Sequence, residues 1–381
     1  MCLLKGEDGM NGVGPQEKNR YDSMTGNGGA KILHIEHWSN PDAATEITGV
    51  DYYERPRECA LKLLEMYPML DGIGVPVSNE PIPRPKLDLE TGSSSNPENH
   101  TVRWGDGETS TFLHGEQYFQ TEEQVFAFSP LEHADKGDWP LPGDGIPDLS
   151  SAEAIYRYLR PRFPSEWGDR APECSCAGIS FYNTMFMWPM LTFGWEMFLA
   201  TCLDDRFERI MDEFAEINRR VFEAQSQLPV NFVCCHDDIV MTRGPVCSRE
   251  WMNKYIFPRY VEFWEYFKRR GIRVNFMTDG NPTEFVDDIV ACGASGLITE
   301  PYADFKAIAK KYPDMMLAGE GDNRILTYGT KDDIRKMVDS MTETGKMSGG
   351  YFMCVGNHIP WNVPADNIKY YFDYSDKYAY R

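Results

Sequence analysis

The 381-residue sequence predicts an α/β fold, a (β/α)8 TIM barrel with an insertion after the second strand. From about residue 170 onward, apolar runs of strand length alternate regularly with amphipathic runs of helical period. Two more strand-like runs, with a helical run between them, lie upstream and bring the number of units to eight. A doubly wound open sheet is the alternative, ranked second because no glycine-rich phosphate loop opens a helix.

The predicted elements follow one another in a regular order along the chain. Strands are expected at residues 31–38, 70–76, 176–185, 230–236, 272–281, 295–301, 314–322 and 350–358. Helices are expected at residues 56–68, 204–225, 248–271, 282–293, 303–313, 330–345 and 363–378. Ser248 and Thr330 are typical N-caps, Gly271 is a typical stop, and Pro282 suits a first helical turn.

The domain organisation follows from shifts in composition. Glycine and charged residues dominate residues 1–30, which we expect to be a mobile leader before a single domain over residues 31–381. Residues 77–150 are rich in Pro, Gly, Ser and Asn, and they form the predicted insertion, in which residues 101–117 are typical of a hairpin.

Charge and hydropathy exclude several classes of partner. Acidic residues outnumber basic ones by 59 to 38, and the formal net charge is −21, which disfavours nucleic acid and anionic membranes as partners. No apolar run approaches the roughly 20 residues of a membrane span, and the first 30 residues contain no apolar stretch of signal-peptide length. Most of the ten cysteines lie in apolar segments, as buried free thiols do, so we expect a cytoplasmic protein.

Polar side chains gather just after the predicted strands, at the end where TIM barrels build their active sites. The rim positions are His37, Trp38, Tyr182, Asn183, His236, Asp237, Asp238, Asp279, Asn281, Glu300, Glu320, Asp322, Asn357 and His358. Asp and Asn at such positions often cap the next helix or close a turn, so Asp279, Asn281 and Asp322 have a structural alternative. The convergence of histidines and carboxylates nevertheless predicts a site that holds a metal or transfers protons, with His236, Asp238, Asp279 and Glu300 as catalytic candidates.

Five segments in this order resemble a known family. They are "HDDIVMTRGPVCSREWMNKYIFPRYVEFWEYFKRRG" (236–271), "DGN" (279–281), "ITEP" (298–301), "LAGEGDNRILTYGTKDDIRKMV" (317–338) and "SGGYFMCVGNHIPWNVPADNIKYYFDY" (348–374). The chain resembles the uroporphyrinogen decarboxylase superfamily, well over residues 176–381 and weakly over residues 31–75. The resemblance implies a TIM-barrel fold.

The resemblance implies one of two activities. Some members decarboxylate uroporphyrinogen without a cofactor, and they hold its carboxylates with arginines just after the first strand. Here that region reads "HIEHWSNPDAATEITG" (34–49), in which Asp and Glu would repel such a ligand. Other members transfer methyl groups to or from a corrinoid protein, usually with zinc, so we expect the corrinoid-dependent methyltransferase branch, with the decarboxylase as the alternative.

The expected metal site differs from that of the members that methylate thiols. Those resemble one another in a His-x-Cys and a later Cys, whereas this chain reads Met277-Thr278-Asp279 and has no cysteine between residues 315 and 330. We therefore expect zinc bound by Glu320 and His358, with His236, Asp279 or Glu300 as the third ligand. Several carboxylates without a Lys or Arg nearby also favour a bound dication, although a metal-free cavity with one protonated carboxylate is the competing outcome.

Substrate and partner follow from the same resemblance. A Lewis acid suits a small methylated donor such as a methyl ether, because it stabilises the departing oxygen. The expected substrate-binding residues are Trp38, Phe181, Tyr182, Asn281 and Trp361, although each aromatic ring could equally be packing. The chain has no Asp-x-His-x-x-Gly run, so the corrinoid should arrive on a separate protein. The long amphipathic helices are consistent with a homodimer.

Overall fold

The computed structural model describes most of the chain from residue 31 to its end. The described residues are 31–71, 75–76, 78–84, 100–103, 109–112, 118–138, 148–162, 176–178, 185–230 and 232–381. The expected leader, residues 1–30, lies outside them.

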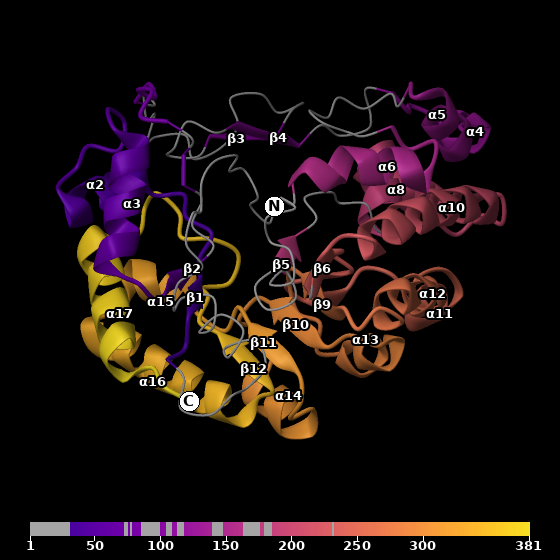
Figure 1. Ribbon diagram of the computed structural model, residues 1–381. Coiled ribbons are helices and arrows are strands. Elements are labelled where there is room, and N and C mark those ends of the chain that lie inside the picture. The colour runs from indigo at the N-terminus through magenta and orange to yellow at the C-terminus, as the bar shows by residue number, and fades with distance from the viewer. Residues whose placement is uncertain are drawn as a thin grey trace.

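A parallel sheet at the centre of the molecule has the strand order β12-β11-β10-β9-β6-β5 (Figure 1). Its strands are β5 (Cys176–Gly178), β6 (Phe232–His236), β9 (Arg273–Thr278), β10 (Gly296–Thr299), β11 (Met316–Ala318) and β12 (Gly350–Phe352). All neighbouring pairs are parallel. In β6, β9, β10, β11 and β12 most side chains are buried on both faces, as expected for a parallel sheet covered by helices.

Two further strands extend this sheet. β1 (His34–Ile35) pairs in parallel with β2 (Leu70–Asp71). Ile35 N donates to Met353 O and Met353 N donates to Leu33 O, both at 2.9 Å, so β1 also lies beside the end of β12. Eight parallel strands thus lie in the order β2-β1-β12-β11-β10-β9-β6-β5. This order confirms the predicted TIM-barrel fold class.

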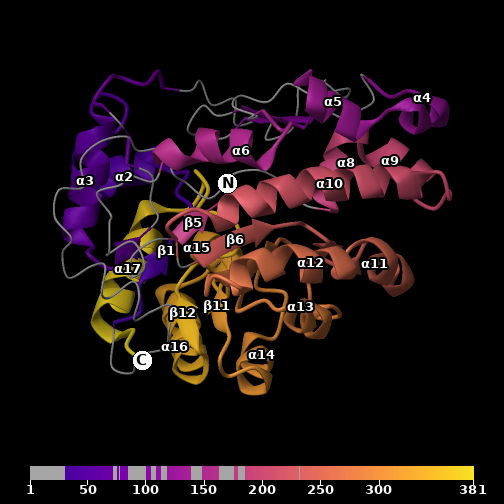
Figure 2. The same ribbon diagram turned by 45° about the vertical axis from the view of Figure 1, so that its right-hand side comes forward.

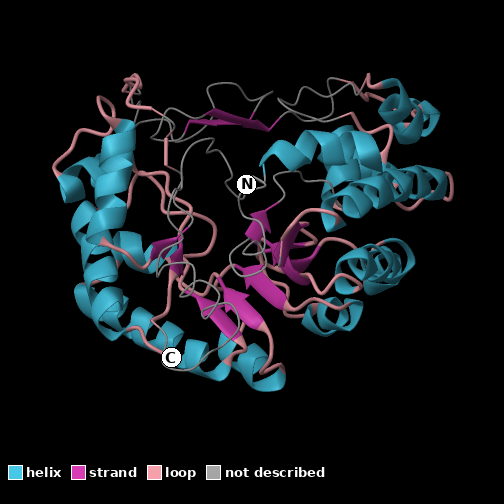
Figure 3. Cartoon of the chain, viewed as in Figure 1, coloured by secondary structure: helices cyan, strands magenta, loops and turns pink. Residues whose placement is uncertain are grey.

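Helices lie outside the central parallel strands in both views (Figures 2 and 3). Those of the barrel units are α2 (Pro41–Thr48), α3 (Pro56–Met66), α8 (Met187–Phe193), α9 (Trp195–Thr201), α10 (Phe207–Ser226), α11 (Arg249–Tyr255), α12 (Phe257–Lys268), α13 (Val286–Cys292), α14 (Phe305–Lys311), α15 (Asn323–Tyr328), α16 (Lys331–Met347) and α17 (Ala365–Tyr378). Ser248 and Thr330 cap α11 and α16 as predicted, each accepting a backbone N–H through its side chain.

The segment predicted as one helix over residues 248–271 is instead two helices, α11 and α12. The break is at Ile256, whose ψ of −65° accompanies a φ of −107°. Pro258 explains the break, because it lacks a backbone N–H and its ring would clash with the carbonyl four residues earlier. α12 still packs on β9, and α11 packs against α12, so the barrel unit is preserved.

The insertion after β2 contains the predicted hairpin, β3 (His100–Arg103) and β4 (Thr109–Phe112), paired antiparallel. It continues with α4 (Glu122–Ala127), α5 (Pro130–Lys136), α6 (Ala152–Leu159) and the short 3-10 helix η2 (Arg160–Arg162). Arg209 and Arg220 of α10 bond backbone carbonyls of this segment, at Phe126, Phe128 and Leu149. The insertion is therefore anchored on α10. Within the described part of the chain, no helix combines the length and apolar character needed to cross a membrane.

Candidate active site at the barrel mouth

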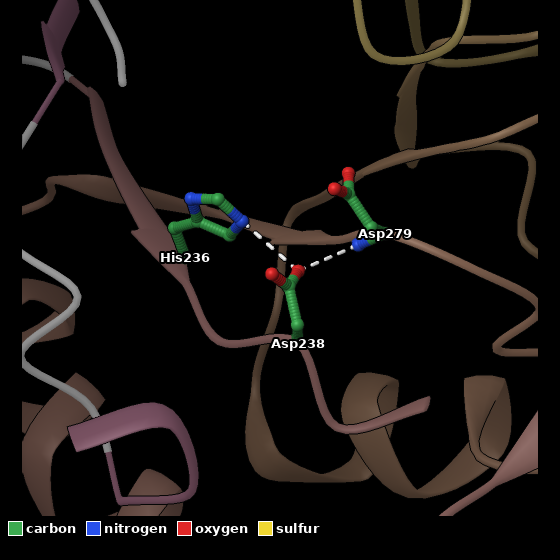
Figure 4. Close-up of side chains that lie close together, drawn as sticks. All are labelled: His236, Asp238 and Asp279. Carbon is green, nitrogen blue, oxygen red and sulfur yellow. Dashed lines mark hydrogen bonds and ion pairs between the residues drawn. The ribbon is translucent and has the colours of Figure 1, made fainter. Parts of the chain in front are cut away.

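Three polar side chains meet where β6 and β9 end. The register of these strands pairs His236 with Met277, which places Asp238 beside Asp279 two residues later. His236 Nε2 lies 3.0 Å from Asp238 Oδ1, and the same oxygen accepts the backbone N–H of Asp279 at 2.7 Å (Figure 4). One donor atom from each of the three residues lies within 4.8 Å of the others. We call these three residues the triad.

Asp237, between the two triad residues of this segment, faces the helix layer. Its carboxylate accepts the backbone N–H groups of Phe186 and Met187, at 3.0 and 2.7 Å, and the hydroxyl of Tyr260 at 2.6 Å. These donors satisfy the fully buried carboxylate and hold the start of α8 against β6. Asp237 therefore has a structural role, whereas its neighbour Asp238 lies at the mouth.

The carboxyl group of Asp279 has a pKa raised to about 7. Burial is the largest cause, and the charges of Asp238 and Glu300 add to it, while His236 opposes it. Glu300 follows β10, and its Oε2 accepts the backbone N–H of Gly280 at 2.7 Å. Within the described ranges, no Lys or Arg forms an ion pair with Asp238, Asp279 or Glu300. The mouth is thus acidic, and its three carboxylates form no direct ion pair with a Lys or Arg among the described residues.

His358 lies beside the triad and is linked to it through Asn357. Asn357 Nδ2 donates to Asp279 Oδ2 at 3.2 Å, and Asn357 Oδ1 lies 2.6 Å from His358 Nδ1. The ring of His37, after β1, meets the ring of His358 edge-on at a centroid distance of 5.6 Å. Burial lowers the pKa of His37. The two histidines form an imidazole pair beside the triad.

Glu320 lies apart from the triad, between the sheet and α16. Its Oε2 accepts the hydroxyl of Tyr351 at 2.6 Å, and its Oε1 accepts Thr344 Oγ1 at 3.1 Å and Ser340 Oγ at 3.4 Å. Burial raises the pKa of Glu320, and these hydroxyl donors oppose the rise. The structure does not bring Glu320 and His358 together as a metal-binding pair. The carboxylates that it groups with His236 are Asp238 and Asp279.

Two of the expected substrate-binding residues have contacts that account for them structurally. Trp38 stacks on Phe372 of α17, with ring centroids 6.1 Å apart. Asn281 Oδ1 accepts both the backbone N–H and the hydroxyl of Thr283, at 3.1 and 2.6 Å, and so closes a turn. These contacts match the packing and turn alternatives that the sequence left open.

The remaining candidates are less informative. Trp361 is half-buried in the segment before α17. Phe181 and Tyr182 lie outside the described residues. Asp322 caps α15 and pairs with Arg324, which is the capping role that an Asp after a strand often has.

Sequence reasoning placed Asn357 on the rim but gave it no role. Its backbone has a φ of 71°, in the left-handed region that non-glycine residues seldom adopt. Two features of the sequence could have drawn attention to Asn357: it follows a glycine, Gly356, and it lies after a predicted strand. Neither feature indicates which residues its side chain contacts. The contact with Asp279 joins residues 78 positions apart and depends on the fold.

Comparisons with known proteins agree with this architecture. Residues 194–378 match the family model described as uroporphyrinogen decarboxylase. A solved structure described as a methyltransferase from Methanosarcina mazei has a TM-score of 0.53 and 15% identity, covering 95% of this chain and 98% of that chain. No curated protein matches the chain significantly.

A xylose isomerase-like TIM barrel protein from Mycobacterium smegmatis, solved in complex with magnesium, also matches, with a TM-score of 0.27 and 12% identity. That match covers 61% of this chain and 90% of the other, and its low TM-score gives it no weight. The family match and the fold shared with the Methanosarcina protein agree with the resemblance in the sequence. Residues 194–378 are thus similar to the uroporphyrinogen decarboxylase family, and the chain shares its fold with the Methanosarcina protein.

Proposed function

We propose that this protein is a methyltransferase that moves a methyl group between a small methylated compound and a corrinoid protein, with a metal Lewis acid at the barrel mouth. The observation that carries the proposal is the triad of His236, Asp238 and Asp279 at the C-terminal ends of β6 and β9. This is where TIM-barrel enzymes place their catalytic groups. The likeness to a solved methyltransferase supports the same activity class.

The donor set of the triad fits a divalent metal. It offers one imidazole nitrogen and two carboxylate oxygens, which zinc accepts, and three protein ligands leave a position open for substrate. The raised pKa of Asp279 reflects the cost of burying neighbouring carboxylates, and a cation between them removes that cost. When bound, the metal would supply a Lewis acid that stabilises the oxygen released as the methyl group leaves.

The chain's own residues would prepare the site for this chemistry. Asp238 accepts the N–H of Asp279 and thereby holds the segment after β9 close to β6. Glu300 holds the next residue, Gly280, from the side of β10. These two contacts fix the backbone that carries Asp279, so the triad is preorganised by neighbouring strands. The corrinoid would be presented by a partner protein over the mouth.

A cofactor-free decarboxylase is the second candidate, because one observation favours it. A carboxyl group with a pKa of about 7 is partly protonated at neutral pH, so Asp279 could act as a general acid without a metal. The absence of arginine from residues 34–49 weighs against a substrate as rich in carboxylates as uroporphyrinogen. Metal content separates the two candidates.

The deciding experiment measures metal and activity together. We expect about one zinc per chain in the purified protein. The visible spectrum of added cob(I)alamin should show its methylation by a methyl ether donor. This methylation should stop after chelation and return when zinc is added. His236→Ala and Asp279→Asn should lose the metal, whereas Glu320→Gln should keep it if the triad is the ligand set. Full activity after exhaustive chelation, with no metal by elemental analysis, would remove the Lewis-acid mechanism.

A further inference from the structure

The loop after β12 has an unusual backbone that its neighbours impose. Asn357 is the one non-glycine residue with a positive φ in the described part of the chain, at 71°. Asn323 Nδ2 donates to Gly356 O at 2.8 Å and to His358 O at 2.5 Å, clamping the loop on both sides of Asn357. Gly356 N donates to Gly321 O at 2.7 Å, which joins the loop to the segment after β11. An uncommon conformation held this firmly, next to a candidate site, often has a functional reason.

Both ends of the Asn357 amide are engaged at the mouth. Nδ2 donates to Asp279 Oδ2, and Oδ1 lies 2.6 Å from His358 Nδ1. A carboxylate only accepts hydrogen bonds, so the NH2 end of the amide must face Asp279 while that group is ionised. The carbonyl oxygen must then face His358, and an amide oxygen also only accepts. The proton of the neutral imidazole is therefore on Nδ1, and Nε2 keeps its lone pair.

We infer that Asn357 is a positioning residue, which orients the Asp279 carboxylate and selects the Nδ1–H tautomer of His358. One amide thereby couples the triad to the imidazole pair of His37 and His358. The tautomer assignment stands on hydrogen-bond geometry alone. The effect on metal binding rests on the proposed function, because it requires Asp279 to be a ligand. Residues that hold ligands in this way usually change metal affinity by about 10–100-fold when they are replaced.

The competing explanation is that Asn357 serves the backbone only. Asn is among the residues that tolerate the left-handed region best, so a positive φ could by itself account for its presence. Glycine adopts that region more readily still but has no amide. Replacement by glycine therefore keeps the backbone conformation and removes both side-chain hydrogen bonds. Replacement by aspartate keeps an acceptor for His358 but removes the donor to Asp279.

The test compares Asn357→Gly and Asn357→Asp with wild type and with Asn362→Gly, an exposed residue between β12 and α17. The tautomer is read from the 15N signals of His358, assigned with His358→Gln, at about pH 8.5, where an ordinary imidazole is neutral. Wild type, Asn362→Gly and Asn357→Asp should show the Nδ1–H form. Asn357→Gly should shift towards the Nε2–H form, with a melting temperature within about 4 °C of wild type.

Zinc affinity, measured by competition with a chelating dye, provides the second readout. Asn357→Gly should bind zinc at least about 10-fold more weakly than wild type, and Asn362→Gly should not differ from wild type. If Asn357→Gly keeps both the tautomer and the zinc affinity of wild type, Asn357 serves the backbone only and the inference is wrong. If wild type binds no zinc but Asn357→Gly changes the tautomer, the proposed metal site is wrong. The inference that Asn357 selects the tautomer of His358 then still holds.

Discussion

At the scale of single residues, two adjacent carboxylates have opposite roles. Asp237 is fully buried and accepts three hydrogen bonds from Phe186, Met187 and Tyr260. Asp238 lies at the mouth and contacts His236 and the backbone of Asp279. Successive side chains at the end of a strand point to opposite sides, so one faces the helix layer and the next faces the mouth. Two residues of the same type, Asp237 and Asp238, therefore have different roles because their side chains face different surroundings.

Replacing each of these two carboxylates should separate stability from function. Asp237→Ala leaves the Tyr260 hydroxyl and two backbone N–H groups buried without this acceptor, so unfolding free energy should fall by about 2–4 kcal/mol. Asp238→Ala should change it by less than about 1 kcal/mol and should abolish metal binding. Urea denaturation and elemental analysis of both variants check this. Equal destabilisation by the two replacements would contradict the assignment of opposite faces.

The raised pKa of Asp279 predicts a pH dependence of stability in the metal-free protein. The folded carboxyl has a pKa of about 7, whereas an unfolded Asp has one of about 3.9. The folded state therefore binds the proton more tightly, and the stability from this group is lost as pH rises from about 4 through 7. Asp279→Asn should flatten this decline, by on the order of 1 kcal/mol for each pKa unit of the shift. Chemical denaturation of chelated wild type and variant from pH 5 to 8 measures it, and parallel curves would show that Asp279 is not the group responsible.

At the scale of elements, the mouth depends on a close backbone approach. The hairpin of β7 (Val240–Met241) and β8 (Gly244–Pro245) lies against the turn that follows β9. Asn281 N donates to Met241 O at 3.0 Å, and a Cβ on Gly280 would lie 2.6 Å from the Met241 carbonyl carbon. Gly280 also has a φ of 81°. The site therefore requires glycine at this turn, both for its conformation and for the space.

A pair of glycine replacements distinguishes these two requirements. Gly280→Ala should lower unfolding free energy by about 2–4 kcal/mol and weaken metal binding, because the hairpin and the Asp279 segment must separate. Gly271→Ala is the matched control: its φ is 70°, but nothing lies within 4 Å of the added Cβ. It should cost only the conformational term, about 1–2 kcal/mol, and leave metal binding intact. Thermal unfolding and zinc titration of both variants test the comparison, and equal effects would remove the argument from close approach.

At the scale of the whole molecule, the first strand is tied to the last barrel unit through a buried carboxylate. Glu36 accepts the hydroxyl of Tyr371 at 3.0 Å and the backbone N–H of Val355 at 3.2 Å, and it lies 3.0 Å from His34 Nδ1. The partners at Val355 and Tyr371 are more than 300 positions away in the sequence. Glu36 thus helps to join the N-terminal and C-terminal parts of the barrel, and the sequence offered no sign of this role.

Removing this carboxylate should destabilise the whole fold. Glu36→Ala leaves the Tyr371 hydroxyl and His34 buried without their acceptor, so unfolding free energy should fall by about 3–5 kcal/mol. Glu46→Ala, at an exposed position of α2, should stay within about 0.5 kcal/mol of wild type. Guanidinium unfolding followed by circular dichroism measures both. A Glu36→Ala protein as stable as the control would show that the link is dispensable.

The sequence by itself determined the fold class and the end of the barrel at which to look. Apolar runs of strand length alternate with runs of helical period along the chain. This local pattern determines the type of each element and the face that it buries, so the element order can be predicted from the sequence. The same logic placed His236, Asp238, Asp279, Glu300 and His358 after strands. The break between α11 and α12 was also encoded locally, by Pro258, although the uninterrupted amphipathic pattern concealed it.

Only the tertiary structure decided which of these side chains meet. Glu320 and Asp279 both follow apolar strands, yet Asp279 joins the triad and Glu320 turns to the hydroxyls of α16. A single positive φ after a strand, such as the 102° of Gly319 before Glu320, redirects the side chain that follows. Asn357 reaches Asp279 for a related reason. Asp279 follows a distant strand, β9, and it lies beside Asn357 only once the barrel has formed.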